Sequence, residues 1–150
     1  MYFDEMEEGR VYELPVTVID EERMLAFAKA YDPLPVHTDE AYARQTHFGG
    51  LIAPGVMSFM AVWRSFLDLG VLDRGIVAGM SNNIEWLFPV RPGDRLSASA
   101  QISSLRRRNH YSGIAEITVR AYNEAGKEVF RAVTRGLMKD RPAGGAPARS

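Results

Sequence analysis

One segment of the chain predicts a helix that is apolar over most of its surface. Between Val56 and Leu67 large apolar residues recur at spacings of three and four, and Gly70 provides a stop. A helix of this kind is stable in water only when other elements cover it. The fold must therefore supply a layer broad enough to wrap one long helix. The residues that form the apolar stripe are Val56, Phe59, Met60, Trp63, Phe66 and Leu67.

Five segments predict the β-strands of this layer. Residues 94–105 show the clearest pattern, because Leu96 and Ile102 belong to an apolar set that alternates with polar residues, as in a half-buried strand. Pro15 cannot donate a ladder hydrogen bond, so it keeps the first strand near an edge. The expected fold class is α+β, with a curved antiparallel sheet of about five strands wrapped around the long central helix. The other strand segments are 11–19, 76–88, 111–123 and 127–139.

A second helical region is predicted before the apolar helix. Asp20 is a suitable N-cap for a helix that runs to about Tyr31. Pro33 and Pro35 end this helix, because each disfavours helical backbone at the residue before it. Thr38 is a suitable cap for the short helix that follows.

Composition and charge exclude several classes of protein. The 150 residues suffice for one domain, expected over 1–140, and the tail 141–150 is expected to be disordered. No cysteine is present, which excludes disulfide frameworks, thiolate metal sites and cysteine nucleophiles. With 18 Lys+Arg against 19 Asp+Glu, no bulk positive charge is available to bind a nucleic acid.

Two further features of the sequence concern membrane insertion and export. The longest apolar stretch, 51–63, is shorter than a membrane span and is interrupted by Pro54 and Gly55. The first eight residues include four acidic and no basic side chains, whereas a signal peptide begins with basic residues. We therefore expect a cytoplasmic protein with no membrane partner.

A loop after the second helix carries the densest cluster of polar residues. The two prolines bend the segment 31–39, so Asp32 and His37 can turn toward one point. A carboxylate and an imidazole that converge on a water form an acid/base pair. The alternative is structural, since Asp-Pro often opens a turn and a histidine beside a helix cap can satisfy backbone groups. No metal is expected, because His37, Asp39, His47 and His110 match no standard ligand spacing.

Two further features suggest ligand binding. The first N–H groups of the apolar helix, near Gly55, could bind a carbonyl oxygen that becomes negative during a reaction. Alternatively, a Pro-Gly pair merely starts a buried helix. The run Arg106, Arg107 and Arg108 is expected in a turn between strands, either as a solvated loop or as a phosphate-binding patch.

Together these residues resemble a known family. Tyr31-Asp32, Pro35-x-His37-x-Asp39, Leu51-Ile52-Ala53 and Gly55-Val56-Met57 are similar to the hydratase motif of MaoC-like dehydratases, the (R)-specific enoyl-CoA hydratases. The later run Phe88-Pro89-Val90-Arg91-Pro92-Gly93-Asp94 resembles a turn of the same family. The resemblance covers most of residues 11–139.

The resemblance implies a hot-dog fold and hydration of trans-2-enoyl thioesters, or the reverse dehydration. Asp32 and His37 would activate a water, and the N–H of Gly55 would stabilise the enolate oxygen. The substrate would also touch residues near the helix start and the arginine run. Coenzyme A or an acyl carrier protein would carry the acyl group, with no other cofactor, and the chains would form a homodimer or a higher homo-oligomer. The expected substrate-binding residues are Pro54, Val56, Ser58, Arg106, Arg107 and Arg108.

Two positions depart from the family motif and keep alternatives open. Leu34 stands where the family often has Asn, and Pro54 stands where it often has His. A catalytically silent acyl-thioester-binding protein is therefore one alternative. A hot-dog thioesterase is another, although Asp68 is the only acid on the apolar helix and lies near its far end.

Overall fold

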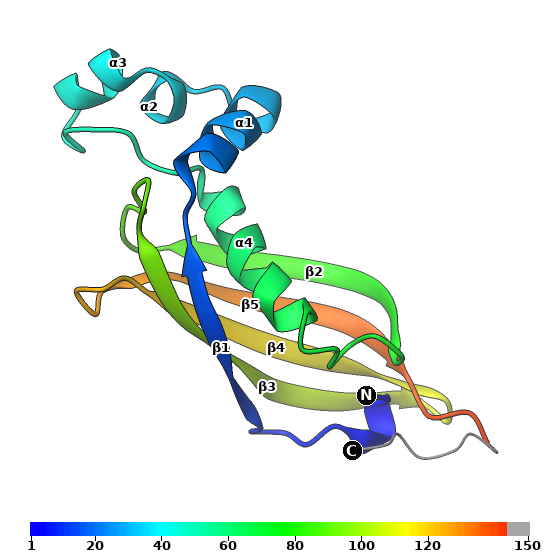
Figure 1. Cartoon of the computed structure of the whole chain (residues 1–150). Helices are drawn as coiled ribbons and strands as arrows, with labels where there is room; N and C mark the ends of the chain where they lie inside the picture. The colour runs from blue at the N-terminus through cyan, green and yellow to red at the C-terminus, as the bar shows by residue number, and fades with distance from the viewer. Residues whose placement is uncertain (144–150) are drawn as a thin grey trace.

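The computed structural model describes residues 1–143, and its elements follow the predicted order (Figure 1). A 3-10 helix, η1, precedes the first strand, and four α-helices separate that strand from the other four. The strands are β1 (Val11–Val18), β2 (Ile76–Trp86), β3 (Arg95–Asn109), β4 (Ser112–Tyr122) and β5 (Glu128–Lys139). The helices are η1 (Phe3–Glu5), α1 (Glu21–Tyr31), α2 (Pro35–Thr38), α3 (Glu40–Gln45) and α4 (Gly55–Leu67).

All five strands form one antiparallel sheet with the order β1-β3-β4-β5-β2. The α+β prediction and the number of strands are confirmed. Strand β1 lies at one edge, as Pro15 predicts, and its register with β3 shifts between Leu14 and Thr17. Strand β2 forms the other edge, so one side of its backbone has no partner strand within residues 1–143.

Helix α4 packs one face against the sheet and leaves the other uncovered (Figure 1). Phe66 is fully buried and meets the ring of Tyr12 edge-on at 5.9 Å, while Phe59 meets Phe130 at 6.0 Å. Burying each such ring contributes about 1.5–3 kcal/mol. On the uncovered face, nearly half of the surface of Val56 and of Met60 is exposed. One sheet therefore covers only part of the apolar helix.

The helix boundaries in the first half agree with the capping rules, with one correction. The carboxylate of Asp20 accepts a hydrogen bond from the Arg23 N–H at 2.9 Å, so it caps α1 as predicted. The predicted cap at Thr38 is wrong, because Thr38 is the last residue of α2 and donates its hydroxyl to the Leu34 carbonyl. Asp39 caps α3 instead, accepting from the Tyr42 N–H at 3.0 Å.

Strand β3 is longer than predicted and includes the arginine run. Arg106 and Arg107 pair with residues of β4, so the expected turn at this place is wrong. The turn follows at His110 and Tyr111, where the Asn109 carboxamide accepts from the Tyr111 N–H at 2.9 Å. The ladder to β4 continues to Asn109 and outweighs the weak strand propensity of a charged run.

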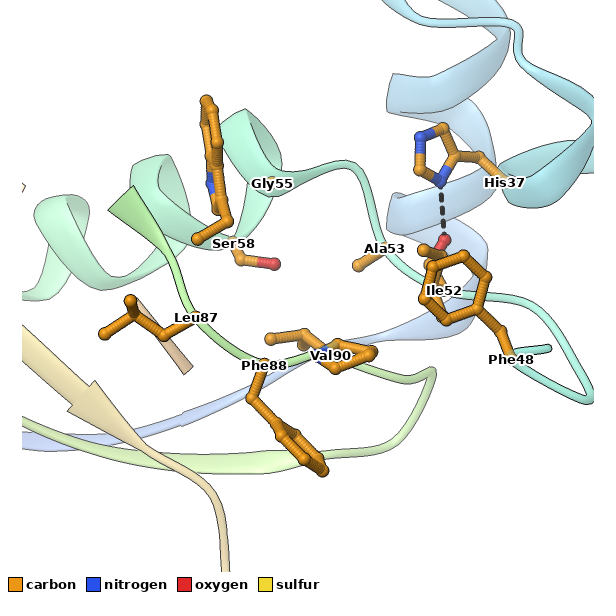
Figure 2. A pocket seen from close by; sticks show the side chains of 11 residues that line it. His37, Phe48, Ile52, Ala53, Gly55, Ser58, Leu87, Phe88 and Val90 are labelled. Atoms are coloured by element: carbon orange, nitrogen blue, oxygen red, sulfur yellow. Dashed lines mark hydrogen bonds between the residues drawn. The ribbon is translucent and has the colours of Figure 1, made fainter. Parts of the chain in front are cut away.

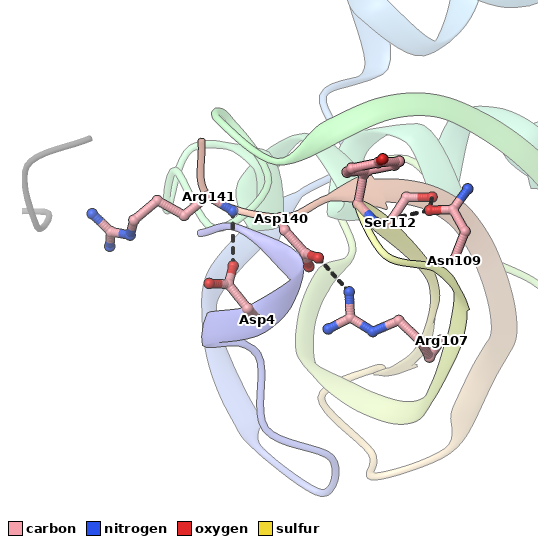
Figure 3. A network of polar contacts seen from close by, with 7 residues as sticks. Asp4, Arg107, Asn109, Ser112, Asp140 and Arg141 are labelled. Atoms are coloured by element: carbon pink, nitrogen blue, oxygen red, sulfur yellow. Dashed lines mark hydrogen bonds and ion pairs between the residues drawn. The ribbon is translucent and has the colours of Figure 1, made fainter. Parts of the chain in front are cut away.

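Polar contacts join the N-terminal segment to the end of β5 (Figure 3). Arg107 pairs with Asp140 and stacks over the ring of Phe3 at 4.6 Å. The backbone N–H of Arg141, a residue in the expected tail, donates to Asp4 at 2.9 Å. Residues 144–150 of that tail lie outside the described residues.

Candidate active site

A pocket of about 280 Å³ lies at the N-terminal end of α4 (Figure 2). Four segments line it: α2, the loop before α4, the first turn of α4, and the end of β2 with the chain that follows it. Most of the lining is apolar, and the polar side chains that reach it are His37, Ser58 and the indole of Trp86. The remaining lining residues are Phe48, Ile52, Ala53, Gly55, Leu87, Phe88, Pro89 and Val90.

The His37 ring is held in one orientation. Only 7% of His37 is exposed, and its Nδ1 lies 2.8 Å from the carbonyl oxygen of Ile52. A carbonyl oxygen only accepts hydrogen bonds, so Nδ1 carries a hydrogen. In the neutral ring, Nε2 is therefore the nitrogen with the lone pair. This is the nitrogen that faces Asp32.

Asp32 and His37 are brought together by a short turn, as predicted. Asp32 ends α1, and its Oδ2 lies 3.4 Å from His37 Nε2. The Leu34 N–H donates to the Asp32 carbonyl, and the His37 N–H donates to the Leu34 carbonyl. The separation of 3.4 Å is longer than a direct N–H···O bond. When the ring is neutral, two acceptors face one another, and a water or hydroxyl that donates to either would be well placed there.

The start of α4 supplies the second polar feature of the pocket. Within residues 1–143, the backbone N–H groups of Gly55 and Val56 have no hydrogen-bond acceptor, as at most helix N-termini. The Ala53 N–H donates to the Val90 carbonyl at 2.7 Å, which fixes the loop just before them. Because a helix dipole places positive charge at its N-terminus, these groups favour an oxygen that carries negative charge.

The other predicted binding residues are dispersed. Ser58 lines the pocket, and its hydroxyl donates weakly to the Pro54 carbonyl at 3.5 Å. Pro54 is fully buried next to the pocket but does not line it. Val56 is exposed on α4 outside the pocket. None of Arg106, Arg107 and Arg108 lines the pocket within one chain, so their predicted contact with substrate stays a prediction.

Two contributors to the site were not predicted from the sequence. The Ile52 carbonyl orients His37, but a backbone group carries no residue-specific signal. Trp86 lies over Gly55, and a Cβ built on Gly55 would overlap its indole ring. In the sequence, Trp86 comes just before the family-like turn that begins at Phe88, and only this position could have suggested its role. Arg91, which belongs to this turn, also donates to the Phe48 carbonyl at 2.5 Å and so ties the turn to the pocket wall.

Residues 1–143 contain neither a cluster suited to a metal ion nor a helix suited to a membrane. Among residues 1–143, no three His, Cys, Asp or Glu side chains lie close enough together to hold a metal ion. In the same range, no helix is both long enough and apolar enough to cross a membrane.

An antiparallel sheet packed along one long helix, with the pocket at the helix start, defines a hot-dog fold protein. The chain belongs to the MaoC-like domain family, whose family model matches residues 4–125. The resemblance drawn from the sequence is therefore confirmed.

Solved structures extend this comparison. The monoamine oxidase regulatory protein of an Archaeoglobus species is 26% identical, with a TM-score of 0.87, over 95% of this chain and 96% of that one. The MaoC-like dehydratase of Rhodospirillum rubrum is 25% identical, with a TM-score of 0.85, over 95% and 99%. The HadBC (3R-hydroxyacyl-ACP dehydratase) complex of Mycobacterium tuberculosis is 25% identical, with a TM-score of 0.76, over 87% and 96%.

Proposed function

We propose that this protein is a hydratase or dehydratase of trans-2-enoyl thioesters. The observation that carries the proposal is the Asp32–His37 pair, which lies beside a pocket that also contains the free N–H groups at the start of α4. Membership of the MaoC-like family supports hydratase or dehydratase chemistry in general. The similarity to a 3R-hydroxyacyl-ACP dehydratase favours an acyl thioester as the substrate.

In the proposed hydration, a water binds between Asp32 and His37. The pair accepts one proton as the water oxygen forms a bond to C3 of the enoyl group. The C2=C3 π electrons move to the thioester carbonyl, and its oxygen accepts hydrogen bonds from the N–H groups of Gly55 and Val56. The accepted proton then passes to C2, which restores the carbonyl. The sum is the addition of H and OH across C2=C3, and the reverse sequence is the dehydration.

This reaction needs no redox cofactor, because the addition of water leaves the total oxidation state of the two carbons unchanged. Proton transfer is supplied by Asp32 and His37, and charge stabilisation by the helix start. We therefore propose that the only non-protein group involved is the carrier of the acyl chain, either coenzyme A or an acyl carrier protein. We also propose that the protein works in the cytoplasm, where such carriers are available.

We further propose that the protein is a homodimer joined along β2. This edge strand is exposed on both faces, and Val77 and Met80 are each 55% exposed. An unpaired apolar edge favours pairing with another strand, and an antiparallel strand can pair with its own copy about a two-fold axis. Trp86 and Leu87, at the end of the same edge, line the pocket. A second copy at β2 would therefore adjoin each pocket.

The test is the loss of enoyl absorbance when the purified protein meets crotonyl-CoA or a longer trans-2-enoyl-CoA. Asp32→Asn and His37→Ala should each lower turnover by about two to four orders of magnitude while the circular dichroism stays unchanged. Asp68→Asn is the matched control, because Asp68 ends α4 at the far end from the pocket and pairs with Arg64. Unchanged turnover in both pocket variants would refute the assignment.

Measuring free thiol in the same reactions tests for thioesterase activity. A thioesterase would release free thiol, and Asp68 is the acidic residue on α4 that the thioesterase hypothesis requires. The exposed side chain of Asp68 forms an ion pair with Arg64 and does not line the pocket. We therefore expect enoyl absorbance to change without the release of thiol.

A second candidate function is acyl-thioester binding without turnover. It is favoured by Leu34 and Pro54, which replace polar residues of the family motif, and by similarity to a monoamine oxidase regulatory protein. Calorimetric binding of acyl-CoA, with no change in enoyl absorbance for any chain length, would support this alternative.

A further inference from the structure

A groove of about 290 Å³ lies on the side of the sheet that faces away from α4. Ala115 and Ile117 belong to the buried core, so Ile114 and Glu116, which alternate with them, point to the outer face. Strand pairing then places Ser104 beside Glu116 and Arg106 beside Ile114 on the same face. The groove is separate from the pocket at the start of α4, since the two share no lining residue.

Two cationic side chains reach this groove. Arg135 is paired with Glu116, with its Nε 2.8 Å from the carboxylate, which holds the guanidinium in place. Arg106 lines the groove and has no acidic partner within residues 1–143. Arg106 is therefore available to a ligand, and Arg135 is already held in place beside it. Two such guanidinium groups suit a ligand with several anionic oxygens.

The one acidic side chain of the groove is already satisfied. Glu116 accepts from Arg135 at one carboxylate oxygen and from the Ser103 hydroxyl at the other, at 3.3 Å. Its charge is thus offset by Arg135, and the net charge of the groove is that of Arg106. The hydroxyls of Ser81 and Ser104 also line the groove, and neither forms a hydrogen bond within residues 1–143. They add two neutral donors to the guanidinium groups.

The apolar part of the groove narrows the class of ligand. Met80 and Ile114 line the same space as the arginines and serines. A bare phosphate would leave these side chains without contacts, whereas a base or a ribose would cover them. We propose that this groove binds a phosphorylated nucleotide, with its phosphate on Arg106 and Arg135 and its apolar part on Met80 and Ile114.

Two sources could supply this nucleotide. It could be the nucleotide end of the coenzyme A that carries the substrate, a reading that rests on the proposed function, or a separate nucleotide that acts as an effector. Met80 and Ser81 belong to the free edge β2, so a second copy paired there would bring its own groove close. A carrier held by one chain could then serve the pocket of the other.

The first experiment measures binding alone and needs no enzymatic activity. Adenosine 3′,5′-bisphosphate is titrated into the full chain by calorimetry, and the affinity should fall as the salt concentration rises. Arg106→Gln should weaken binding about 10- to 100-fold, the effect expected for losing hydrogen bonds to a charged group. Arg95→Gln is the matched control, because Arg95 is exposed on the same strand but outside the groove, and it should change affinity less than about threefold.

The outcomes are distinct. No binding by the wild-type protein, or equal losses in both arginine variants, would overturn the proposal. If Arg106→Gln raises KM for an enoyl-CoA but not for the N-acetylcysteamine thioester, the nucleotide belongs to the carrier. If it weakens bisphosphate binding but leaves both KM values unchanged, the nucleotide is a separate ligand. Failure of the proposed hydratase reaction would leave the calorimetric result intact, so the two proposals can fail independently.

Discussion

The indole of Trp86 occupies the space into which a side chain at Gly55 would project. Gly55 does not have a positive φ, so its backbone does not require glycine. The demand for glycine at the start of α4 therefore comes from the close approach of Trp86. This contact links the end of the edge strand β2 to the N–H groups that we propose stabilise the enolate.

Gly55→Ala should destabilise the fold by about 1–3 kcal/mol, because the new methyl group overlaps the indole. In a protein that already carries Trp86→Ala, Gly55→Ala should lower the unfolding free energy much less, because the indole that the methyl group would overlap is absent. Urea unfolding of the wild type, both single variants and the double variant measures this coupling. Strictly additive effects would show that Trp86 is not the reason for glycine.

Leu34→Asn should stabilise the protein by about 0.5–2 kcal/mol. Leu34 is the N-cap of α2, its side chain makes no capping hydrogen bond, and the residue is 55% exposed. An asparagine there can accept from the first N–H groups of α2, the helix that carries His37. Leu34→Ala is the control, since it removes the same apolar surface without adding a cap. Equal unfolding free energies for the two variants would contradict the capping argument.

Val77→Asp should weaken self-association about 100-fold or more, because it would place an unpaired charge from each copy in the proposed β2 interface. Val16→Asp is the matched control, since Val16 is similarly exposed, at 52% against 55%, but lies on the opposite edge strand. Sedimentation velocity over a range of concentrations measures the effect. A dimer that persists in Val77→Asp and dissociates in Val16→Asp would place the interface at β1.

Tyr12 should make stability depend on pH in alkaline solution. Burial raises the pKa of the Tyr12 phenol above its usual value, while Arg10 acts in the opposite direction. The phenol of the unfolded chain then ionises first, so the Tyr12 contribution is complete below about pH 10. It is lost as the pH rises through the higher pKa of the folded state. Tyr12→Phe should reduce the fall in unfolding free energy above pH 10, as measured by urea titration at several pH values.

The parts of the fold that could be predicted from the sequence depend on local rules. The alternation around Leu96 and Ile102 follows from one buried face, and the cap at Asp20 needs only the residues beside it. The misplaced cap at Thr38 was a local error of one residue, whereas the error at the arginine run arose because a longer-range partner decided the outcome. Arg106 and Arg107 stay in β3 because β4 continues beside them.

The candidate site also has one part that could be predicted from nearby residues and one part that depends on tertiary packing. Asp32 and His37 are close in the sequence, and two prolines between them make a turn predictable. The Ile52 carbonyl and the Trp86 indole reach the pocket only through tertiary packing, which no spacing in the sequence records. The resemblance to MaoC-like proteins indicated residue roles but did not include either of these contacts.

Helices α1, α2 and α3 lie beyond one end of the sheet, apart from the layer formed by α4 and the strands (Figure 1). They bury few residues, namely Met24, Ala28, His37 and Ala43. The proposed proton-transfer groups thus belong to a segment that contributes little to the main core. A substitution there can change the chemistry at small cost in stability, whereas one at the start of α4 disturbs both. The two halves of this site therefore differ in how tightly their residues are tied to the stability of the whole fold.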